Sequence, residues 1–214
     1  IIAPRSTELN LESDNGIDKF LEKNKSIVDT IKYIIHSAAY YGGLGINIED
    51  PVGLIDKNSR MSVNIFKACK YLKLNKIVSV GSACSYPGNI SDDLKEKDLF
   101  NGRCHNSVEA YGFSKRLQLV LQSAYYKQYK ITSNQIILTN LYGEYDVFNE
   151  YRGHALPTFI KKIVDAKIYK KNVEVWGDGT PIRQFLYVKD AAKIIVESLS
   201  FDHDLEPINV GGEE

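Results

Sequence analysis

Short apolar runs alternate along this chain with longer stretches in which apolar residues recur at helical spacing. The runs are rich in β-branched residues and bounded by turn residues, which predicts buried strands at 33–35, 77–80, 135–138 and 173–176. The longer stretches predict helices at 61–72, 117–124 and 192–199. Strands that alternate with helices in this way indicate an α/β fold with a mainly parallel sheet.

A smaller lobe is expected to interrupt this pattern between residues 144 and 184. Gly153, Pro157 and the turn cluster at 177–181 break the alternation there, and one helix is expected at about 155–167. The strand and helix that follow resemble the earlier units, so we assign them to the main domain. The resulting division is a main domain at 1–143, a lobe at 144–184, a return to the main domain at 185–200, and the start of a further lobe segment at 201–214.

Composition and charge narrow the classes of ligand. The 214 residues are 43% hydrophobic, and 27 Lys and Arg balance 27 Asp and Glu, so no overall basic field exists to attract nucleic acid or an anionic membrane. No apolar run approaches the roughly 18 residues of a membrane span, and no signal peptide is evident at the start. Three cysteines without paired short spacings argue against a disulfide framework and a metal site. We therefore expect a cytoplasmic protein that binds any anionic ligand locally.

Two pairs of reactive side chains follow the second predicted strand. Ser82 and Cys84 come directly after it, and reactive groups of α/β sheets gather at the carboxyl ends of strands. Tyr111 and Lys115 are four residues apart on the next helix and share a face. A nearby cation lowers the pKa of a phenol, so Tyr111 is a candidate for proton exchange. The alternatives are a turn or cap role for Ser82 and a half-buried helix tyrosine beside a surface lysine.

Six segments, in this order and spacing, make the chain similar to the extended short-chain dehydrogenase/reductases. Within them, the chain most resembles the branch that contains GDP-L-fucose synthase. The segments are His36-Ser37-Ala38-Ala39 with Gly42-Gly43, residues 81–87, residues 111–115, Thr139-Asn140-Leu141-Tyr142-Gly143, residues 153–157, and residues 175–186. The resemblance implies a doubly wound (Rossmann) sheet that binds NADP, with a smaller interleaved substrate lobe.

The resemblance also implies roles for the reactive residues. Tyr111 would donate a proton to the oxygen of a C4 ketone, Ser82 would hydrogen-bond that oxygen, and Lys115 would hold the nicotinamide ribose and lower the pKa of Tyr111. Cys84 and His154 would be the base and the acid that invert C3 and C5 beside the ketone. The alternatives are an inert core cysteine and a surface histidine at a helix start.

The resemblance also implies which residues bind the cofactor and the substrate. Arg5 follows the first apolar run, where a cation suits the 2′-phosphate of NADP, although it could also be a plain surface arginine. Arg183 would bind the nucleotide diphosphate with its planar fork. The other expected cofactor contacts are Ala38, Ala39, Asn58, Asn140, Leu141 and His154, and the other expected substrate contacts are Lys162 and Trp176, the latter also explained as a packing residue.

The implied function is NADPH-dependent epimerisation at C3 and C5 and reduction at C4 of a GDP-4-keto-6-deoxy-hexose. The alternatives are a C4-reductase or epimerase for another nucleotide sugar, such as a GDP-heptose, and a non-catalytic dinucleotide-fold binding protein. A 4,6-dehydratase would carry an acidic residue in the segment of Ser82 and Cys84, where none stands. The family further implies a homodimer through a four-helix bundle built from residues 52–72 and 107–130.

The resemblance places Ile1 in the second strand of the fold. The first strand and its glycine-rich pyrophosphate loop are then expected to be missing from residues 1–214. Because that loop holds the cofactor's pyrophosphate at a helix N-terminus, we expect this polypeptide alone to bind NADPH weakly or not at all.

Overall fold

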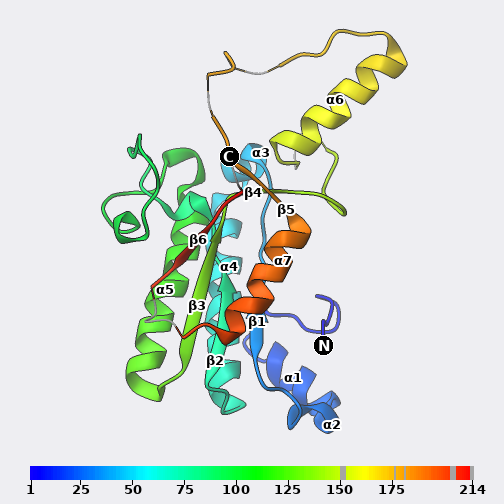
Figure 1. Cartoon of the computed structure of the whole chain (residues 1–214). Helices are drawn as coiled ribbons and strands as arrows, with labels where there is room; N and C mark the ends of the chain where they lie inside the picture. Colours follow the sequence, from blue (N-terminus) through cyan, green and yellow to red (C-terminus); the bar gives the residue numbers. More distant parts are fainter. Residues whose placement is uncertain (150–152, 176, 181, 203–205, 213–214) are drawn as a thin grey trace.

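A four-stranded parallel sheet forms the centre of the molecule (Figure 1). The computed structural model describes residues 1–149, 153–175, 177–180, 182–202 and 206–212. The strand order is β1 (Ile34–His36), β2 (Lys76–Val80), β3 (Thr132–Leu138) and β6 (Ile208–Val210). The register places Ile35 opposite Val78 and Val80 opposite Ile136. The parallel α/β sheet expected from the sequence is confirmed.

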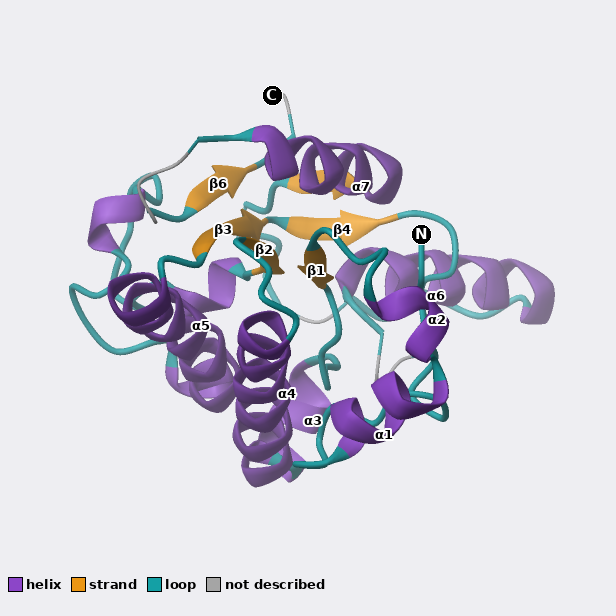
Figure 2. Ribbon diagram, turned by 90° about the horizontal axis from the view of Figure 1, so that it is seen from below, coloured by secondary structure: helices purple, strands orange, loops and turns teal. Residues whose placement is uncertain are grey.

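Helices cover both faces of this sheet, which confirms a doubly wound arrangement (Figure 2). Helices α4 (Pro51–Tyr71) and α5 (Glu109–Tyr129) lie side by side on one face, and α7 (Val188–Glu197) lies on the other. Successive residues of β2 face opposite sides, so Ile77 packs with Phe66 of α4 while Val78 packs with Ala191 of α7. Strands buried on both faces read as largely apolar runs, which is why β2 and residues 135–138 of β3 could be predicted.

Local signals explain where α4 begins. Asp50 precedes it, and its carboxylate accepts a hydrogen bond from the Gly53 amide at 2.9 Å, while Pro51 occupies the first helical position. The second carboxylate oxygen of Asp50 accepts from the Tyr40 hydroxyl at 3.1 Å. The N-terminal cap of α4 therefore also holds the segment that follows β1.

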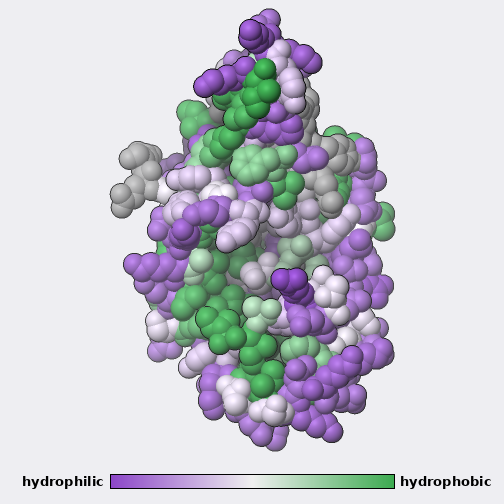
Figure 3. All heavy atoms as spheres, turned by 90° about the vertical axis from the view of Figure 1, so that its right-hand side faces the viewer, coloured by the Kyte–Doolittle hydropathy of each residue, from purple (hydrophilic) through white to green (hydrophobic). Residues whose placement is uncertain are grey.

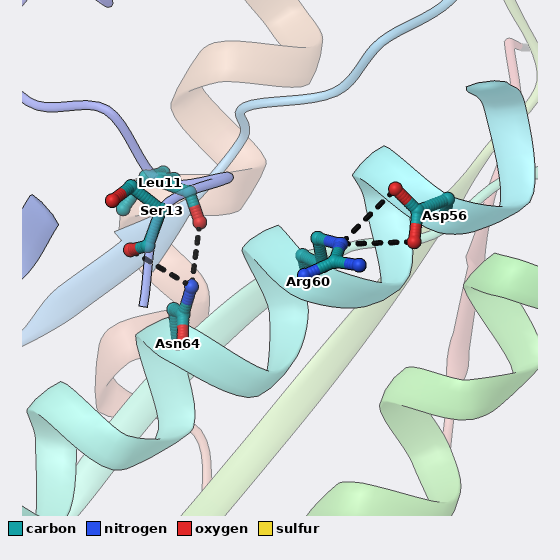
Figure 4. A network of polar contacts seen from close by, with 5 residues as sticks. All are labelled: Leu11, Ser13, Asp56, Arg60 and Asn64. Carbon is teal, nitrogen blue, oxygen red and sulfur yellow. Dashed lines mark hydrogen bonds and ion pairs between the residues drawn. The ribbon is translucent and has the colours of Figure 1, made fainter. Parts of the chain in front are cut away.

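Residues 11–13 contact α4, and no residue before β1 lies in the sheet. The side-chain amide of Asn64 donates to the carbonyl oxygens of Leu11 at 2.9 Å and Ser13 at 3.2 Å (Figure 4). Ile1 and Ile2 are exposed and lie in no strand, contrary to the expectation of a strand there. The helices that follow are α1 (Gly16–Lys23) and α2 (Lys25–Val28), and α3 (Leu44–Glu49) comes after β1.

The described residues also form four one-turn 3₁₀ helices. They are η1 (Ala83–Ser85), η2 (Glu96–Asp98), η3 (Asn106–Val108) and η4 (Ser198–Ser200). Within the described part of the chain, no helix is both long enough and apolar enough to cross a membrane.

The lobe region differs from the sequence expectation in three places. Strand β5 (Phe185–Tyr187) pairs in parallel with a short strand that was not predicted, β4 (Asn140–Tyr142), in a separate two-stranded sheet rather than in the main sheet. Residues 173–175 are exposed and form no strand, and Trp176 lies outside the described residues. Residues 208–210, expected to begin a lobe segment, pair with β3 instead.

The helix expected in the lobe is present as α6 (Ala155–Tyr169) and projects away from the sheet (Figure 1). Its one buried residue is Pro157, while its apolar side chains are exposed at the top of the molecule (Figure 3). These side chains include Phe159, Ile160, Ile163 and Ile168. The division into a main domain and a lobe otherwise stays a prediction.

Candidate active site

The candidate residues converge where β1 and β2 end. The segment Ser82–Cys84 follows β2 directly, and the first turns of α5 carry Tyr111 and Lys115 past it. Gly112 makes this close approach possible, because a Cβ there would lie 2.2 Å from the Cys84 carbonyl oxygen and 2.9 Å from the Cys104 sulfur. The fold therefore brings the hydroxyl, thiol, phenol and ammonium groups of the sequence prediction to one edge of the sheet.

Lys115 is a buried cation. Its side chain is 2% exposed, and its Nζ donates a hydrogen bond to the Val80 carbonyl oxygen at 2.9 Å. Nζ lies 5.7 Å from the centre of the Tyr111 ring. Burial lowers the pKa of Lys115 from 10.5 to about 8, because the charged form loses hydration that one carbonyl replaces only in part.

The expectation that Lys115 lowers the pKa of Tyr111 is wrong for this structure. Burial raises the pKa of Tyr111 above its usual value of 10, and the neighbouring groups Cys84 and Tyr41 raise it further. Burial is the largest cause, and the ammonium of Lys115 donates its hydrogen bond to the Val80 carbonyl oxygen. Tyr111 is consequently protonated at neutral pH.

Ser82 has the cap role that was one of its two interpretations. Its Oγ accepts a hydrogen bond from the Cys84 amide at 3.2 Å and so begins η1. Accepting this bond leaves the hydroxyl hydrogen of Ser82 able to donate to a ligand. The cap and the proposed carbonyl contact are therefore compatible.

His154 reaches the site through a residue that sequence reasoning missed. It immediately precedes α6, and its exposed ring stacks on Tyr41 with ring centres 5.7 Å apart and an interplanar angle of 12°. Tyr41 in turn is close enough to Tyr111 to raise its pKa. The sequence did contain a signal for Tyr41, because this residue follows β1 and precedes Gly42-Gly43 in a segment that carries the family resemblance.

His36 is buried at the end of β1, close to Lys115. Burial, and then the charge of Lys115, lower the pKa of His36 from 6.5 to about 3, so its ring is neutral near pH 7. Its Nε2 lies 3.5 Å from the Ser62 hydroxyl. A neutral imidazole here adds no second positive charge beside the ammonium.

The expected cofactor contacts occupy different environments. Ala38 is exposed and Ala39 is half-buried in the segment after β1, and Arg5 is exposed near the N-terminus. Asn58 is 3% exposed and bonded within the protein. Its amide donates to the carbonyl oxygens of Tyr40 and Leu54, at 2.8 and 2.7 Å, and its oxygen accepts from the Tyr40 amide at 2.8 Å. Asn58 thus shapes the segment that contains the alanines.

The remaining candidates lie on β4 and in the lobe. Asn140 is exposed and its amide donates to the Gln184 carbonyl oxygen at 3.0 Å, while Leu141 is half-buried against the main core. Lys162 on α6 donates to the Glu174 carbonyl oxygen at 3.1 Å, and Arg183 is exposed, with Nη1 2.8 Å from the Ile182 carbonyl oxygen. No group of metal-ligating side chains large enough to hold an ion occurs among the described residues.

Comparison with known proteins identifies the family. The model of the NAD dependent epimerase/dehydratase family matches residues 5–211. The chain belongs to this family. Members of the family that resemble it include GDP-L-colitose synthase of Yersinia pseudotuberculosis, with 35% identity over 98% of this chain and 68% of that protein. GDP-L-fucose synthase of Azorhizobium caulinodans is 32% identical over 93% of this chain and 62% of that protein.

A solved structure of the family has the same fold. The GDP-L-fucose synthetase from Naegleria fowleri bound to NADP superposes with a TM-score of 0.88 at 30% identity, over 100% of this chain and 68% of that one. The chain thus spans 62–68% of the length of these epimerase/dehydratase relatives. It is a relative of NAD(P)-dependent GDP-sugar epimerases and reductases.

Proposed function

We propose that this protein is an NADPH-dependent enzyme that epimerises C3 and C5 of a GDP-4-keto-6-deoxy-hexose and reduces its C4 ketone. The observation that carries the proposal is the convergence of Tyr111, Lys115, Ser82 and Cys84 at the end of β2. The relatives named as GDP-L-fucose and GDP-L-colitose synthases support a GDP-sugar as substrate.

The reduction needs a proton at the ketone oxygen. Tyr111 would donate this proton, because its phenol carries a hydrogen at neutral pH and lies beside Cys84 in the segment that follows β2. Ser82 holds the same oxygen with its free hydroxyl hydrogen while the Cys84 amide fixes its Oγ. NADPH, when bound, would supply the hydride.

The residues around Lys115 fit a dinucleotide ribose. A lysine ammonium has three hydrogens to donate, and Val80 is the acceptor that the structure provides for one of them. Small side chains at Ala38 and Ala39 leave the backbone after β1 approachable. Lys115 would hold the ribose hydroxyls, and Arg5 would favour the 2′-phosphate of NADP over NAD, in line with the NADP bound to the Naegleria relative.

Epimerisation needs a base and an acid near the carbons beside the ketone. Cys84 is half-buried next to Tyr111, and His154 stacks on Tyr41. Cys84 would remove the acidified proton and His154 would return one from the other side. A reductase that does not epimerise would use Tyr111 and Lys115 and leave this pair idle.

We also infer that two copies associate through α4 and α5. Their outer surfaces expose Val52, Ile55, Phe113 and Val120 by 74%, 37%, 56% and 54%, although the two helices pack side by side. Packing these surfaces against a second pair would form the four-helix bundle. Light scattering should give a dimer mass that falls to the monomer mass in Phe113→Glu, and an unchanged mass would contradict this interface.

Incubation in deuterated water separates the proposed activities. The protein as its gene encodes it, supplied with a GDP-4-keto-6-deoxy-hexose and NADPH, should give a reduced product with deuterium at C3 and C5. Cys84→Ser should keep much of the reduction while losing this deuterium, because a hydroxyl is a much weaker base than a thiolate. Reduction without deuterium at C3 and C5 would refute epimerisation and leave the C4-reductase.

Tyr111→Phe tests the proton donor itself. It keeps the ring and loses the hydroxyl, so NADPH consumption should fall by about 10²–10⁴-fold, the range for loss of a general acid. Tyr126→Phe, on the exposed surface of the same helix, is the matched control and should retain activity. Undiminished activity of Tyr111→Phe would exclude the assigned role.

A further inference from the structure

A buried glutamine that the proposed chemistry does not use touches both halves of the site. Gln135 lies on β3 and its side chain is 0% exposed. Its Nε2 donates to the Lys115 carbonyl oxygen at 2.9 Å and to Gln118 Oε1 at 2.8 Å. Both amide hydrogens therefore bond to the single turn of α5 that carries Lys115.

The stem of the same side chain packs under the residue before Ser82. A Cβ built on Gly81 would lie 3.1 Å from both Cγ and Cδ of Gln135, so the two residues are in close contact. The Gly81 amide is itself bonded to β3, donating to the Ile136 carbonyl oxygen at 2.8 Å. Gln135 thus lies between the strand end that leads to Ser82 and the helix turn of Lys115.

Gln118, which accepts from Gln135, also belongs to a network of polar side chains that joins α5 to α4. Gln118 Nε2 donates to the Ser62 hydroxyl on α4 at 3.1 Å, and Ser62 Oγ lies 3.5 Å from His36 Nε2 at the end of β1. All of these side chains are buried. A shift of α5 against β3 would break the two bonds that the Gln135 amide nitrogen donates, so these bonds favour one arrangement of the two elements.

We propose that Gln135 is a positioning residue: its amide holds the Lys115 turn of α5 in register with the Gly81–Ser82 segment. This rests on the proposed function, in which Lys115 and Ser82 must act on neighbouring parts of one cofactor–substrate pair. Displacement of a catalytic group by about 1 Å can cost on the order of 10²-fold in rate. Gln135 limits that displacement without touching substrate.

The chain offers a matched control on the same helix. Gln122 is also 0% exposed, and its Nε2 donates to the Ser79 hydroxyl at 3.0 Å. It lies about two turns beyond Lys115. Methionine has nearly the length and volume of glutamine without its amide, so Gln135→Met and Gln122→Met each remove one buried amide at little steric cost. They differ in that the first contacts the Lys115 turn.

The first readout is independent of activity. The rate at which an amine-acetylating reagent modifies Lys115 is measured by mass spectrometry, relative to exposed Lys127 on the same helix. We expect Gln135→Met to raise the relative rate at Lys115 by about tenfold or more, which corresponds to about 1.4 kcal/mol. Gln122→Met should change it less than about twofold. Equal effects of both variants, or none in Gln135→Met, would overturn the proposal.

The second readout is whether each variant changes kcat or KM. Gln135→Met should lower kcat by about tenfold with little change in KM, and Gln122→Met should lower neither, since misplacement affects the reacting geometry more than binding. If no variant or wild type reduces the sugar, the proposed function fails while the acetylation result still decides the role of Gln135.

A folding defect is separated by a double variant. Gln118→Met combined with Gln135→Met replaces both partners of one buried bond, which restores stability better than removing one partner. This variant should fold and still show fast acetylation of Lys115. If it unfolds as well, or folds with Lys115 protected, Gln135 serves stability alone and the proposal is wrong.

Discussion

Replacing the buried Lys115 by methionine should stabilise the protein at neutral pH while abolishing its catalysis. Burial lowers the pKa of Lys115 from 10.5 to about 8. At about 1.36 kcal/mol for each pKa unit, the buried ammonium costs about 3 kcal/mol of unfolding free energy below pH 8. Methionine removes this cost but loses the bond to Val80 O, worth about 1 kcal/mol. The expected net gain is about 2 kcal/mol, or roughly 4–8 °C in Tm.

The sign of this effect reverses with pH. The folded state of the wild type binds the lysine proton less tightly than the unfolded state, so its stability is lowest below pH 8 and rises until about pH 10.5. Lys115→Met lacks this rise. The difference between the two proteins should therefore favour the variant at pH 7, cross zero between pH 8 and 10.5, and favour the wild type by about 1 kcal/mol above that range.

Urea unfolding followed by circular dichroism at constant ionic strength measures this difference. Lys127→Met on the exposed part of α5 is the control, and it should stay within about 0.5 kcal/mol of wild type at every pH. The reasoning is refuted if Lys115→Met is less stable than wild type at pH 7, or if the difference does not change between pH 7 and 11.

Three further changes test other parts of the structure. Between pH 7 and pH 4, the unfolding free energy of the wild type should fall by about 3 kcal/mol more than that of His36→Gln, as measured by urea unfolding. The reason is that the pKa of His36 is lowered to about 3 in the folded state, so only the unfolded state binds the proton in this range. Equal losses in the two proteins would contradict this. Gly112→Ala should cost at least about 1–3 kcal/mol in thermal unfolding, since its Cβ would lie 2.2 Å from the Cys84 carbonyl oxygen; an unchanged Tm would show that this approach is looser. Asp50→Ala should cost about 1 kcal/mol by loss of the α4 cap, whereas Asp56→Ala, within α4, should cost little, and equal costs would argue against the cap.

Strands β1 to β3 of the main sheet could be predicted because they carry a simple signal, whereas β6 was not expected there. Strand β2 is buried on both faces, and from Ile77 to Val80 it is apolar except for Ser79. The amphipathic helices between the strands carry the 3.6-residue period. A strand was expected at β5, but β4 and the pairing of β4 with β5 gave no such signal. These strands have three residues each and partly exposed faces, and their pairing joins segments far apart in sequence, so tertiary packing decides it.

The candidate site was predictable in identity but less so in environment. The spacing of Tyr111 and Lys115 on one helix face gave both residues. It could not give the acceptor of the Lys115 ammonium, because Val80 is on another element, and so it gave the wrong direction for the pKa of Tyr111. Tyr41 and Gln135 were missed for the same reason: their contacts are long-range.

The most direct test of the central claim is transfer of deuterium from NADPH labelled at C4 of the nicotinamide to the sugar. The protein as its gene encodes it, given a GDP-4-keto-6-deoxy-hexose, should yield a GDP-sugar one mass unit heavier, with the label at C4 of the hexose by NMR. Tyr111→Phe should slow this transfer by about 10²–10⁴-fold. A wild type that transfers no label to C4, or a Tyr111→Phe variant that transfers it at the wild-type rate, would contradict the account.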